Sequence, residues 1–381
     1  MEILGQFFSN ITVLFSYVIP FLFVLTVIVF FHELGHFMVA RWCGVAIETF
    51  SVGFGREIFG FNDKHGTRWK FSWIPLGGYV KFLGDENAAS APDREKIREL
   101  EGDEAKASFH NKPLSARAAV VAAGPIANFI LAIVIFAGIF MVLGQRITAP
   151  VVDTIQPNSV AASAGFQVGD VIKKIDGTDI QSFSDMQRIV RTSADKLLSF
   201  EVERNGKIVS LPATPKLREV KDRFGNIHRI GLLGVSRNTS KGNITTKHYG
   251  PIEAVGAGTQ ETWFVVSRTM GYLYNIIIGR EKADQLGGPL RIAQISGQVA
   301  TVSFAALMNL AAVLSVSIGL INLFPVPMLD GGHLLFYGIE AVRGKPLSER
   351  AQEFGFRVGL ALVIMLMIFA TWNDLVHFDV F

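Results

Sequence analysis

Four stretches of the chain carry apolar residues at nearly every position, over lengths that a single helix needs to cross a bilayer. They lie at 13–38, 117–143, 304–326 and 356–372. About 20 residues of helix span the hydrocarbon core, so the pattern predicts four transmembrane helices. No basic residue precedes the first stretch and no small-residue cleavage site follows it, which indicates a retained span instead of a signal peptide.

The positive residues around these spans predict an orientation. Lys and Arg follow the first and third spans, and they are missing before the first span and after the fourth. Because such residues concentrate in short cytoplasmic loops, we expect these two loops to face the cytoplasm. Both termini and the long segment 144–303 are then expected outside it.

Two regions alternate apolar and polar residues with the period of a β-strand. Between the first two spans, Gly53–Asp85 predicts strands and hairpins, with an ordinary surface hairpin as the alternative, and 86–112 is expected to be helical or mobile. The second region, about 147–215, predicts a small soluble domain. Its expected elements are strands at Val151–Ile155, Val168–Ile172, Ile175–Gly177 and Phe200–Arg204, a helix at Phe183–Val190, and hairpin turns at Asp176-Gly177 and Asn205-Gly206.

Further along the chain, the stretch 251–278 is apolar and aromatic. A helix of this kind can lie in the plane of the membrane interface. We therefore expect an interfacial helix between the soluble domain and the third span.

Composition narrows the class of protein. Half of the residues are apolar, 18% are charged and the net charge is +3, which excludes a disordered chain and gives no basic surface for nucleic acid. Cys43 is the only cysteine, so neither an intrachain disulfide nor a cysteine-based zinc site is possible. Any metal must be held by His and carboxylate side chains.

The strongest chemical signal is His32-Glu33-Leu34-Gly35-His36, within the first predicted span. Residues four apart lie on one face of a helix, so His32 and His36 can hold one metal ion while Glu33 reaches an adjacent water. Three ionisable groups in a membrane helix are costly without a function. The alternative is a set of buried polar groups that satisfy one another.

A catalytic zinc usually has three protein ligands, and two residues compete for the third position. Asp330 follows the third predicted span and precedes two glycines. Spans one and three run in the same direction, so residues late in each reach the same depth. His333 is the rival ligand. The alternative for Asp330 itself is an ordinary turn carboxylate that binds no metal.

These residues resemble the site-2 intramembrane zinc proteases, specifically the bacterial regulator-of-sigma-E protease group. The resemblance covers His32–His36, the Asn322–Gly331 segment (Asn-x-x-Pro-x-Pro-x-Leu-Asp-Gly), Ala123–Phe129 with its Gly-Pro-x-x-Asn signature, and the hairpin segment Pro75–Lys81. Leu286–Leu290 is similar to a Gly-Pro-Ile loop of that family, and Ile155–Gly177 resembles one permuted bacterial PDZ domain.

The resemblance implies a role for each matched residue. His32, His36 and Asp330 are implied as zinc ligands, and Glu33 as the catalytic base. The substrate contacts that it implies are Asn128, Asn322, Pro325, Pro327, Gly77, Gly78 and Tyr79. Gly124-Pro125 and Asn128 could alternatively serve only as a close-packing point between helices, and the PDZ domain could be a spacer without a ligand.

The expected fold is a multi-pass α-helical membrane protein with four transmembrane helices, a membrane-associated β-hairpin region and an inserted extracytoplasmic PDZ domain of α+β type. The expected boundaries are 1–143 and 304–381 for the two halves of the protease core, 144–220 for the PDZ domain, and 221–303 for the segment that follows it.

The expected function is zinc-dependent endoproteolysis of single-pass membrane proteins in the inner membrane. The resemblance implies anti-sigma factors or remnant signal peptides as substrates, an active site toward the cytoplasm, a periplasmic PDZ domain with a peptide or protein ligand, and no nucleic acid partner. The alternatives are a non-enzymatic PDZ-bearing scaffold with a structural metal and a tethered peptidase that acts on soluble peptides.

Overall fold

The computed structural model of the chain describes residues 2–86, 93–221, 227–237, 244–279, 283 and 287–377. It divides into two compact units. The membrane unit comprises Met1–Gly138, Val255–Val266 and Leu286–Phe381, and the inserted unit comprises Ile139–Ala254 and Ser267–Gln285.

Four helices of the membrane unit are long and apolar enough to cross a bilayer. They are α1 (Glu2–Trp42), α4 (Leu114–Val142), α9 (Phe304–Asn322) and α11 (Glu349–His377), and they confirm the four predicted spans. The predicted end of the third span at 326 is wrong, because α9 ends at Asn322. Pro325 and Pro327 lack the backbone N–H that a continuing helix needs.

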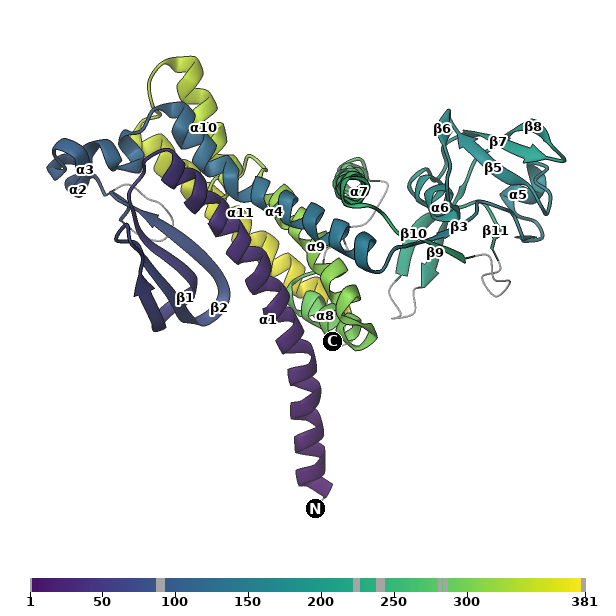
Figure 1. Cartoon of the computed structure of the whole chain (residues 1–381), viewed down its shortest axis with the longest axis horizontal. Helices are drawn as coiled ribbons and strands as arrows, with labels where there is room; N and C mark the ends of the chain where they lie inside the picture. Colours follow the sequence, from purple (N-terminus) through teal and green to yellow (C-terminus); the bar gives the residue numbers. More distant parts are fainter. Residues whose placement is uncertain are drawn as a thin grey trace. The chain divides into compact units, whose positions relative to one another are not determined.

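A long hairpin lies alongside the C-terminal half of α1 (Figure 1). Strand β1 (Ile47–Asn62) pairs antiparallel with β2 (Arg68–Phe82), which confirms the predicted hairpin region. Phe50 of β1 is paired with Val80 on one side and with Trp69 on the other, so the start of β1 is the middle of three local strands. The stretch 78–82 of β2 therefore forms an edge.

Apolar packing attaches this hairpin to α1. Phe50 is fully buried, its ring stacks on Trp69 at a centroid distance of 4.2 Å, and Phe37 of α1 meets Phe50 at 5.4 Å. The charged segment that follows contains α2 (Arg94–Glu99), α3 (Gly102–Ala107) and a 3₁₀ turn at Phe109–Asn111. These elements confirm the helical expectation for the part of 86–112 that the structure describes.

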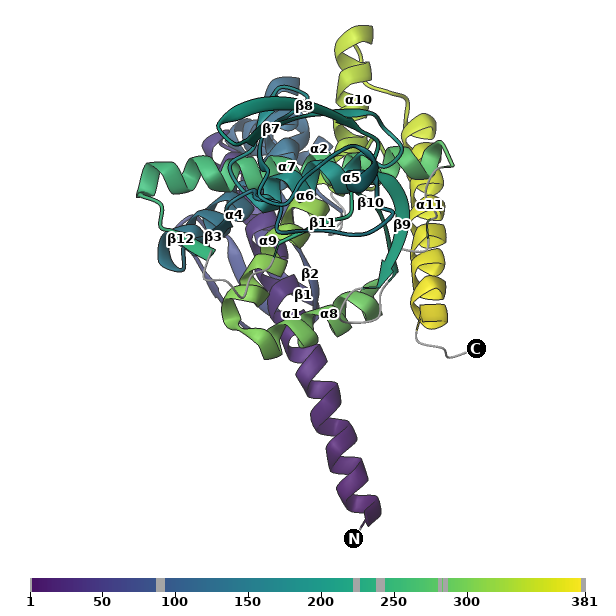
Figure 2. The ribbon, with the colours of Figure 1, turned by 90° about the vertical axis from the view of Figure 1, so that its right-hand side faces the viewer.

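Three further helices complete the region between the inserted domain and the C-terminus. Helix α7 (Pro251–Ile277) confirms the predicted helix at 251–278, and α8 (Pro289–Val302) and α10 (Asp330–Arg343) were not predicted. Helix α8 packs against α1 and α9 (Figure 2). The carboxylate of Asp374 in α11 accepts hydrogen bonds from three amides at the start of α8, those of Gly288, Leu290 and Arg291.

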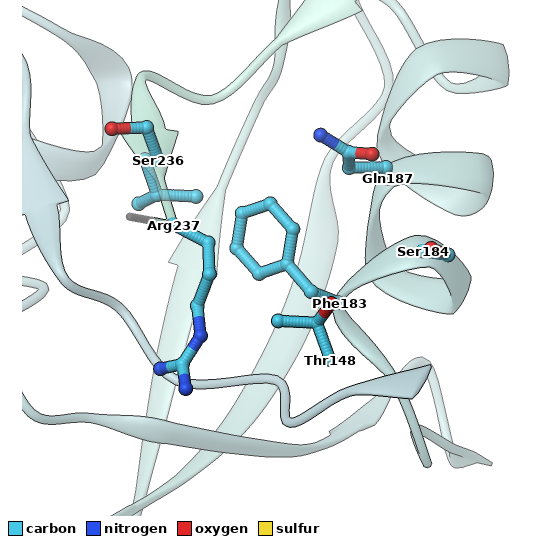
Figure 3. A pocket seen from close by; sticks show the side chains of 7 residues that line it. Thr148, Phe183, Ser184, Gln187, Ser236 and Arg237 are labelled. Carbon is cyan, nitrogen blue, oxygen red and sulfur yellow. The ribbon is translucent and has the colours of Figure 1, made fainter. Parts of the chain in front are cut away.

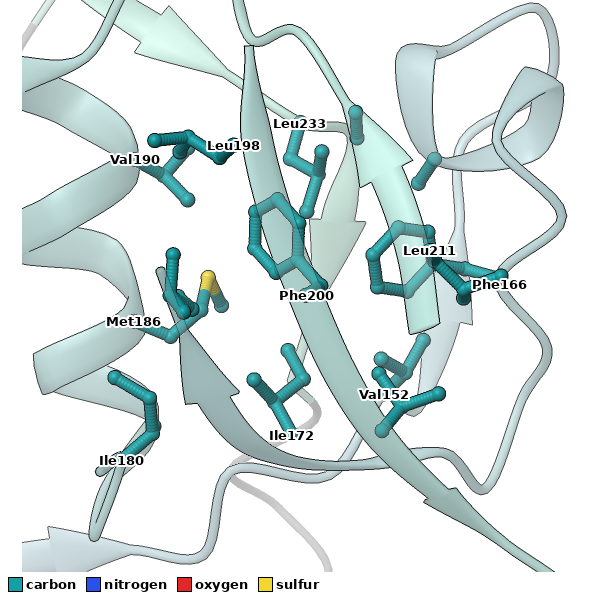
Figure 4. Packing of buried hydrophobic residues seen from close by; sticks show 14 of the residues in the cluster. Val152, Phe166, Ile172, Ile180, Met186, Val190, Leu198, Phe200, Leu211 and Leu233 are labelled. Atoms are coloured by element: carbon teal, nitrogen blue, oxygen red, sulfur yellow. The ribbon is translucent and has the colours of Figure 1, made fainter. Parts of the chain in front are cut away.

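The inserted unit is built around a four-stranded antiparallel sheet with the order β6-β5-β7-β8. The strands are β5 (Val171–Ile175), β6 (Thr178–Asp179), β7 (Leu198–Arg204) and β8 (Lys207–Ala213). Helix α5 (Val160–Ser163) and helix α6 (Phe183–Thr192) accompany the sheet, and α6 begins with a capping box made by Ser182 and Asp185. Figure 4 shows Phe200, Ile172 and Met186 in its core.

The sequence patterns placed some of these elements correctly. The helix at 183–190, the strand at 200–204 and both turns are confirmed, and Asp176 and Asn205 have the positive φ that such turns require. The strand expected at 168–172 is shifted to β5 at Val171–Ile175, and the separate strand expected at Ile175–Gly177 is wrong, because Ile175 ends β5 and Asp176-Gly177 forms the turn. Of the strand expected at 151–155, only β4 (Thr154–Ile155) forms, with an isolated bridge at Val151.

Several short strands of this unit were not predicted at all. They are β3 (Gln145–Thr148), β9 (Lys216–Lys221), β10 (Ile227–Leu232), β11 (Val235–Ser236) and β12 (Ile244–Lys247). β3 pairs with β12, and β4 pairs with β11. The two ends of the domain are therefore joined by strand pairing over residues far apart in the sequence.

Candidate metal centre

Helix α1 presents both histidines on one face. The imidazole rings of His32 and His36 meet edge to face at a centroid distance of 4.9 Å, and their Nε2 atoms are 3.3 Å apart. The two side chains are each 12% exposed. Two ring nitrogens this close repel unless a proton or a cation lies between them.

A strained turn brings a carboxylate from the other end of the chain to the same place. Asp330 is the first residue of α10, directly after the irregular segment that follows α9. Met328 in this segment has φ +84°, a conformation that costs energy for a residue with a side chain. A Cβ at Gly331 would lie 2.3 Å from the carbonyl oxygens of Leu323 and Phe324, so only glycine permits the tight turn.

The three side chains converge on one point. The Asp330 carboxylate lies 3.1 Å from His32 Nε2 through Oδ2 and 3.6 Å from His36 Nε2 through Oδ1. Among the described residues, His32, His36 and Asp330 form the one group of three His, Cys, Asp or Glu side chains close enough to share an ion. His333 is not part of it, and its ring lies instead against Phe356 at 5.5 Å.

Close approach of α4 encloses the cluster. A Cβ at Gly124 would lie 2.3 Å from His36 Nε2 and 2.9 Å from His32 Cε1. On the other helix, a Cβ at Gly35 would lie 2.4 Å from the carbonyl oxygen of Ala123. Glycines at both positions let the two backbones approach, as small residues do between membrane helices.

Helix α4 also supplies the hydrogen-bond partners of both rings. His36 Nδ1 donates to the carbonyl oxygen of Val120 at 2.8 Å, which leaves its Nε2 lone pair directed at the cluster. His32 Nδ1 lies 3.2 Å from the side-chain amide of Asn128. Partners of this kind orient metal-binding imidazoles in many metalloproteins.

The spacing of the ligand atoms fits zinc. Tetrahedral zinc bound to nitrogen and oxygen at about 2.0–2.1 Å sets neighbouring ligand atoms about 3.3 Å apart. The three observed separations are 3.1, 3.3 and 3.6 Å. In addition, Asp330 Oδ2 is buried, and its ion-pair contact is the His32 ring of the same cluster.

Glu33 lies between the cluster and the hairpin edge. Its carboxylate accepts a hydrogen bond from the amide of Val80, and a Cβ at Gly78 would lie 3.1 Å from Glu33 Cγ. The edge strand and the carboxylate next to the metal ligands are therefore neighbours.

The remaining predicted residues lie around this centre at different places. Tyr79 stacks on Phe54 at 6.0 Å, and a Cβ at Gly77 would strike the same Phe54 ring. Asn322 ends α9, Pro325 is exposed, and the carbonyl oxygen of Pro327 lies where a Cβ at Gly359 of α11 would be. The structure thus places Asn128 beside the cluster, Gly78 beside Glu33, and Tyr79 and Gly77 within the hairpin.

Sequence reasoning missed Val120 and Gly35 as parts of this site. A backbone carbonyl carries no residue signature, so nothing in the sequence marks Val120. Gly35 stands inside the His-x-x-x-His motif, and its lack of a Cβ could have been read as a sign of close helix contact.

A His-Glu-x-x-His helix completed by a distant carboxylate, among membrane-length helices, is the arrangement of a membrane metallopeptidase. The family model described as Peptidase family M50 matches residues 20–366, and the chain belongs to this family.

Curated relatives agree over nearly the whole chain. A Rhizobium meliloti protein whose name describes a zinc metalloprotease is 51% identical, covering 94% of this chain and 96% of its own. Metalloprotease MmpA of Caulobacter vibrioides is 43% identical, covering 95% and 96%. Regulator of sigma-E protease RseP of Salmonella typhimurium is 31% identical, covering 93% and 97%. The chain is a zinc metalloprotease, which excludes the scaffold without activity.

Among solved structures, a PDZ domain of an SdrC-like protein from Listeria monocytogenes is similar to 23% of this chain and 83% of its own, with 16% identity and a TM-score of 0.18. A PDZ domain of the corresponding Listeria innocua protein is similar to 26% of this chain and 99% of its own, with 15% identity and a TM-score of 0.20.

Proposed function

We propose that this zinc metalloprotease cleaves peptide bonds within or beside the transmembrane helix of single-pass membrane proteins. The observation that carries the proposal is that Asp330 converges with His32 and His36, and that these two histidines lie on α1, a helix long and apolar enough to cross a membrane. Anti-sigma factors or remnant signal peptides are the proposed substrates, and the name of the sigma-E protease relative supports a role in regulated intramembrane proteolysis.

His32, His36 and Asp330 are the proposed ligands, and Glu33 is the proposed base. Zinc held by these residues would lower the pKa of a bound water, so that hydroxide could attack an amide near neutral pH, and it would polarise the scissile carbonyl. Glu33 would accept the proton of that water and deliver it to the nitrogen of the leaving amine. The hydrogen bond from the Val80 amide holds the Glu33 carboxylate beside the edge strand during both transfers.

The hairpin edge is the proposed platform for the substrate. A helix hides its peptide bonds in internal hydrogen bonds, so the substrate must be extended before it is cut. The amides of Val80 and Phe82 bond to Glu33 and Asp85, away from β1, and strand alternation places the backbone groups of Gly78 on the same side. An extended substrate pairing there would pass Glu33.

The inserted unit is proposed as a PDZ-type domain that binds a peptide or a protein segment. A cavity of about 290 Å³ is lined by residues of β3, α6 and β11, among them Thr148, Gln187 and Ser236. Figure 3 shows the Phe183 ring between Arg237 and Gln187 in this cavity. Among the described residues β11 pairs only with β4, which leaves its other edge for strand addition.

The proposed location is the inner membrane, with the metal centre toward the cytoplasm and the inserted domain in the periplasm. The distribution of Lys and Arg around the four spans supports this orientation.

The test is cleavage of a single-pass model substrate by the full chain in lipid vesicles, together with zinc analysis. Glu33→Gln should keep its zinc and lose cleavage by about 10²–10⁴-fold, because it removes only the base. Glu353→Gln, which changes an exposed carboxylate on α11, is the matched control and should cleave normally. Undiminished cleavage by Glu33→Gln would remove this residue from the mechanism.

A second arm of the same experiment tests the membrane substrate. An unstructured soluble peptide with the sequence of the cleaved segment should be a much poorer substrate than the membrane-embedded protein. Equal cleavage of the two would replace the proposal with a tethered peptidase that acts on soluble peptides.

A further inference from the structure

We infer that Asn128 is a positioning residue for His32, and that it acts on the metal site instead of contacting substrate. The inference rests on the proposed role of His32 as a metal ligand. Asn128 lies on α4, one helical turn after Gly124, and it is fully buried. A side chain with no exposed surface has no face to offer a substrate, whereas its amide is 3.2 Å from His32 Nδ1.

Packing of two helices holds Asn128 in place. The hydroxyl of Ser315 in α9 donates to the backbone carbonyl of Asn128 at 2.9 Å. A Cβ at Gly319, one turn further along α9, would lie 3.1 Å from Asn128 Cβ. α4 and α9 together therefore fix the position from which the amide reaches His32.

The amide is suited to this ring because it carries both a donor and an acceptor. A neutral imidazole also has one of each, and the partner of one nitrogen decides which nitrogen bears the hydrogen. With Nδ2 toward the ring, His32 bears its hydrogen on Nε2, directed at Asp330 Oδ2 3.1 Å away. With Oδ1 toward the ring, the hydrogen is on Nδ1 and the Nε2 lone pair is free for a metal.

Because Asn128 Oδ1 lacks a hydrogen-bond partner, the arrangement with Oδ1 toward the His32 ring is favoured once a metal binds. Asn128 Oδ1 is buried and has no hydrogen-bond partner. A half-turn of the amide gives Oδ1 a bond from His32 Nδ1–H, and a cation satisfies Asp330 Oδ2. Asn128 can thus serve His32 in both the metal-free and the metal-binding form.

His32 and His36 differ in the hydrogen-bond partner of their Nδ1 atoms. The partner of His36 Nδ1 is the carbonyl oxygen of Val120, which can only accept, so His36 is held permanently in the metal-binding form. For His32, a side chain decides which ring nitrogen bears the hydrogen. A substitution of that side chain can therefore weaken the binding of zinc by His32.

The test is the zinc dissociation constant of the full chain, measured by competition with a chelator. Asn128→Leu has a similar size but no polar atom, and we expect it to weaken zinc binding about 10–100-fold. Asn128→Asp keeps an acceptor of the same shape and should bind zinc within a few-fold of the wild type. Asn111→Leu, in the 3₁₀ turn before α4, is the matched control and should bind zinc normally.

Two outcomes would overturn the inference. If both Asn128 variants bind zinc like the wild type and lose only kcat, Asn128 acts on the substrate. If nitrogen NMR of the zinc-loaded wild type shows His32 coordinated through Nδ1, the assigned hydrogen bond is absent, and this result does not depend on any variant folding. Failure of the wild type itself to bind zinc would instead contradict the proposed ligands.

Discussion

The inserted unit and the helix contacts of the membrane unit differ in the residues they bury. Most fully buried positions of the inserted unit are large and apolar, such as Phe200, Ile172 and Met186. Those between the membrane helices include small or polar residues such as Ala132, Asn128 and Ser315, while many large apolar side chains of these helices are exposed. Lipid solvates large apolar groups, so membrane helices gain stability from close contact and buried hydrogen bonds.

The two units also differ in how they hold a buried carboxylate, and the difference decides which carboxylate can bind a cation. In the inserted unit the buried carboxylate of Asp170 is neutralised by Arg204, with N–O distances of 2.7 Å. The carboxylate of Asp330 has no arginine or lysine in its ion-pair contacts, which are both to imidazoles. The first arrangement stabilises a fold, and the second leaves ligand atoms for a cation.

The largest expected effect is on the apolar core of the inserted unit. Phe200→Ala deletes a fully buried ring and should destabilise this unit by about 3–5 kcal/mol. Zinc binding should be unchanged, because the proposed ligands His32, His36 and Asp330 all lie in the membrane unit. Thermal unfolding and zinc titration of the same sample measure both, and loss of zinc would show that the units are not independent.

The next largest effect is expected on zinc affinity, at the contact between α4 and the rings of His32 and His36. Gly124→Ala places a methyl group 2.3 Å from His36 Nε2 and should weaken zinc binding on the order of 100-fold. Gly138→Ala on the same helix meets nothing within 4 Å and should bind zinc like the wild type. Equal zinc affinity of the two variants would contradict the described approach of α4.

A smaller effect is expected at the ion pair between α4 and α10. Arg117 pairs with Glu340 and its guanidinium lies 4.9 Å from the Tyr337 ring centroid. Both charged side chains are mostly buried, so Glu340→Gln should lower the free energy of unfolding by about 2 kcal/mol. The exposed Arg357–Glu353 pair on α11 is the control, and Glu353→Gln should cost under about 0.5 kcal/mol. Denaturation of the full chain in detergent measures the free energy of unfolding of each variant.

The smallest effect is a pH dependence of the inserted unit. Burial alone would raise the pKa of Asp170, but hydrogen bonds from Arg204 and the Gln167 amide outweigh it and hold the pKa below its ordinary value of 3.8. Ionised Asp170 therefore stabilises the fold above about pH 4, and this contribution is lost as pH falls through the lowered pKa. Asp170→Asn should flatten the acid limb of the unfolding profile, and an unchanged limb would exclude Asp170 as its cause.

The sequence predicted what depends on local pattern. Four spans, the hairpin, helix α6 and the tight turns follow from hydrophobic period, capping residues and Asn-Gly or Asp-Gly pairs. The short strands β11 and β12 were not predicted, because their partners β4 and β3 lie far away in the sequence. The antiparallel pair β9 and β10 was not predicted either. The end of α9 was placed too late, since apolar residues continue past Asn322 to the prolines that stop the helix.

The same division holds for the candidate site. His32, Glu33 and His36 follow from helical spacing alone. Spacing favours Asp330 as the third ligand but leaves His333 as a rival, and the resemblance implies Asp330. Distances in the folded chain separate these two, because α10 turns His333 toward Phe356. The orientation of His36 depends on the Val120 carbonyl, a backbone atom that no sequence pattern identifies.

The shared metal site of His32, His36 and Asp330 is tested most directly by zinc content and X-ray absorption of the purified full chain, with Asp330→Asn and His333→Asn compared with the wild type. We expect one zinc per wild-type chain, with two imidazole ligands and oxygen ligands at about 2.0–2.1 Å. Asp330→Asn should lose zinc, and His333→Asn should leave the spectrum unchanged. Full zinc content and an unaltered coordination shell in Asp330→Asn would show that Asp330 is not a ligand.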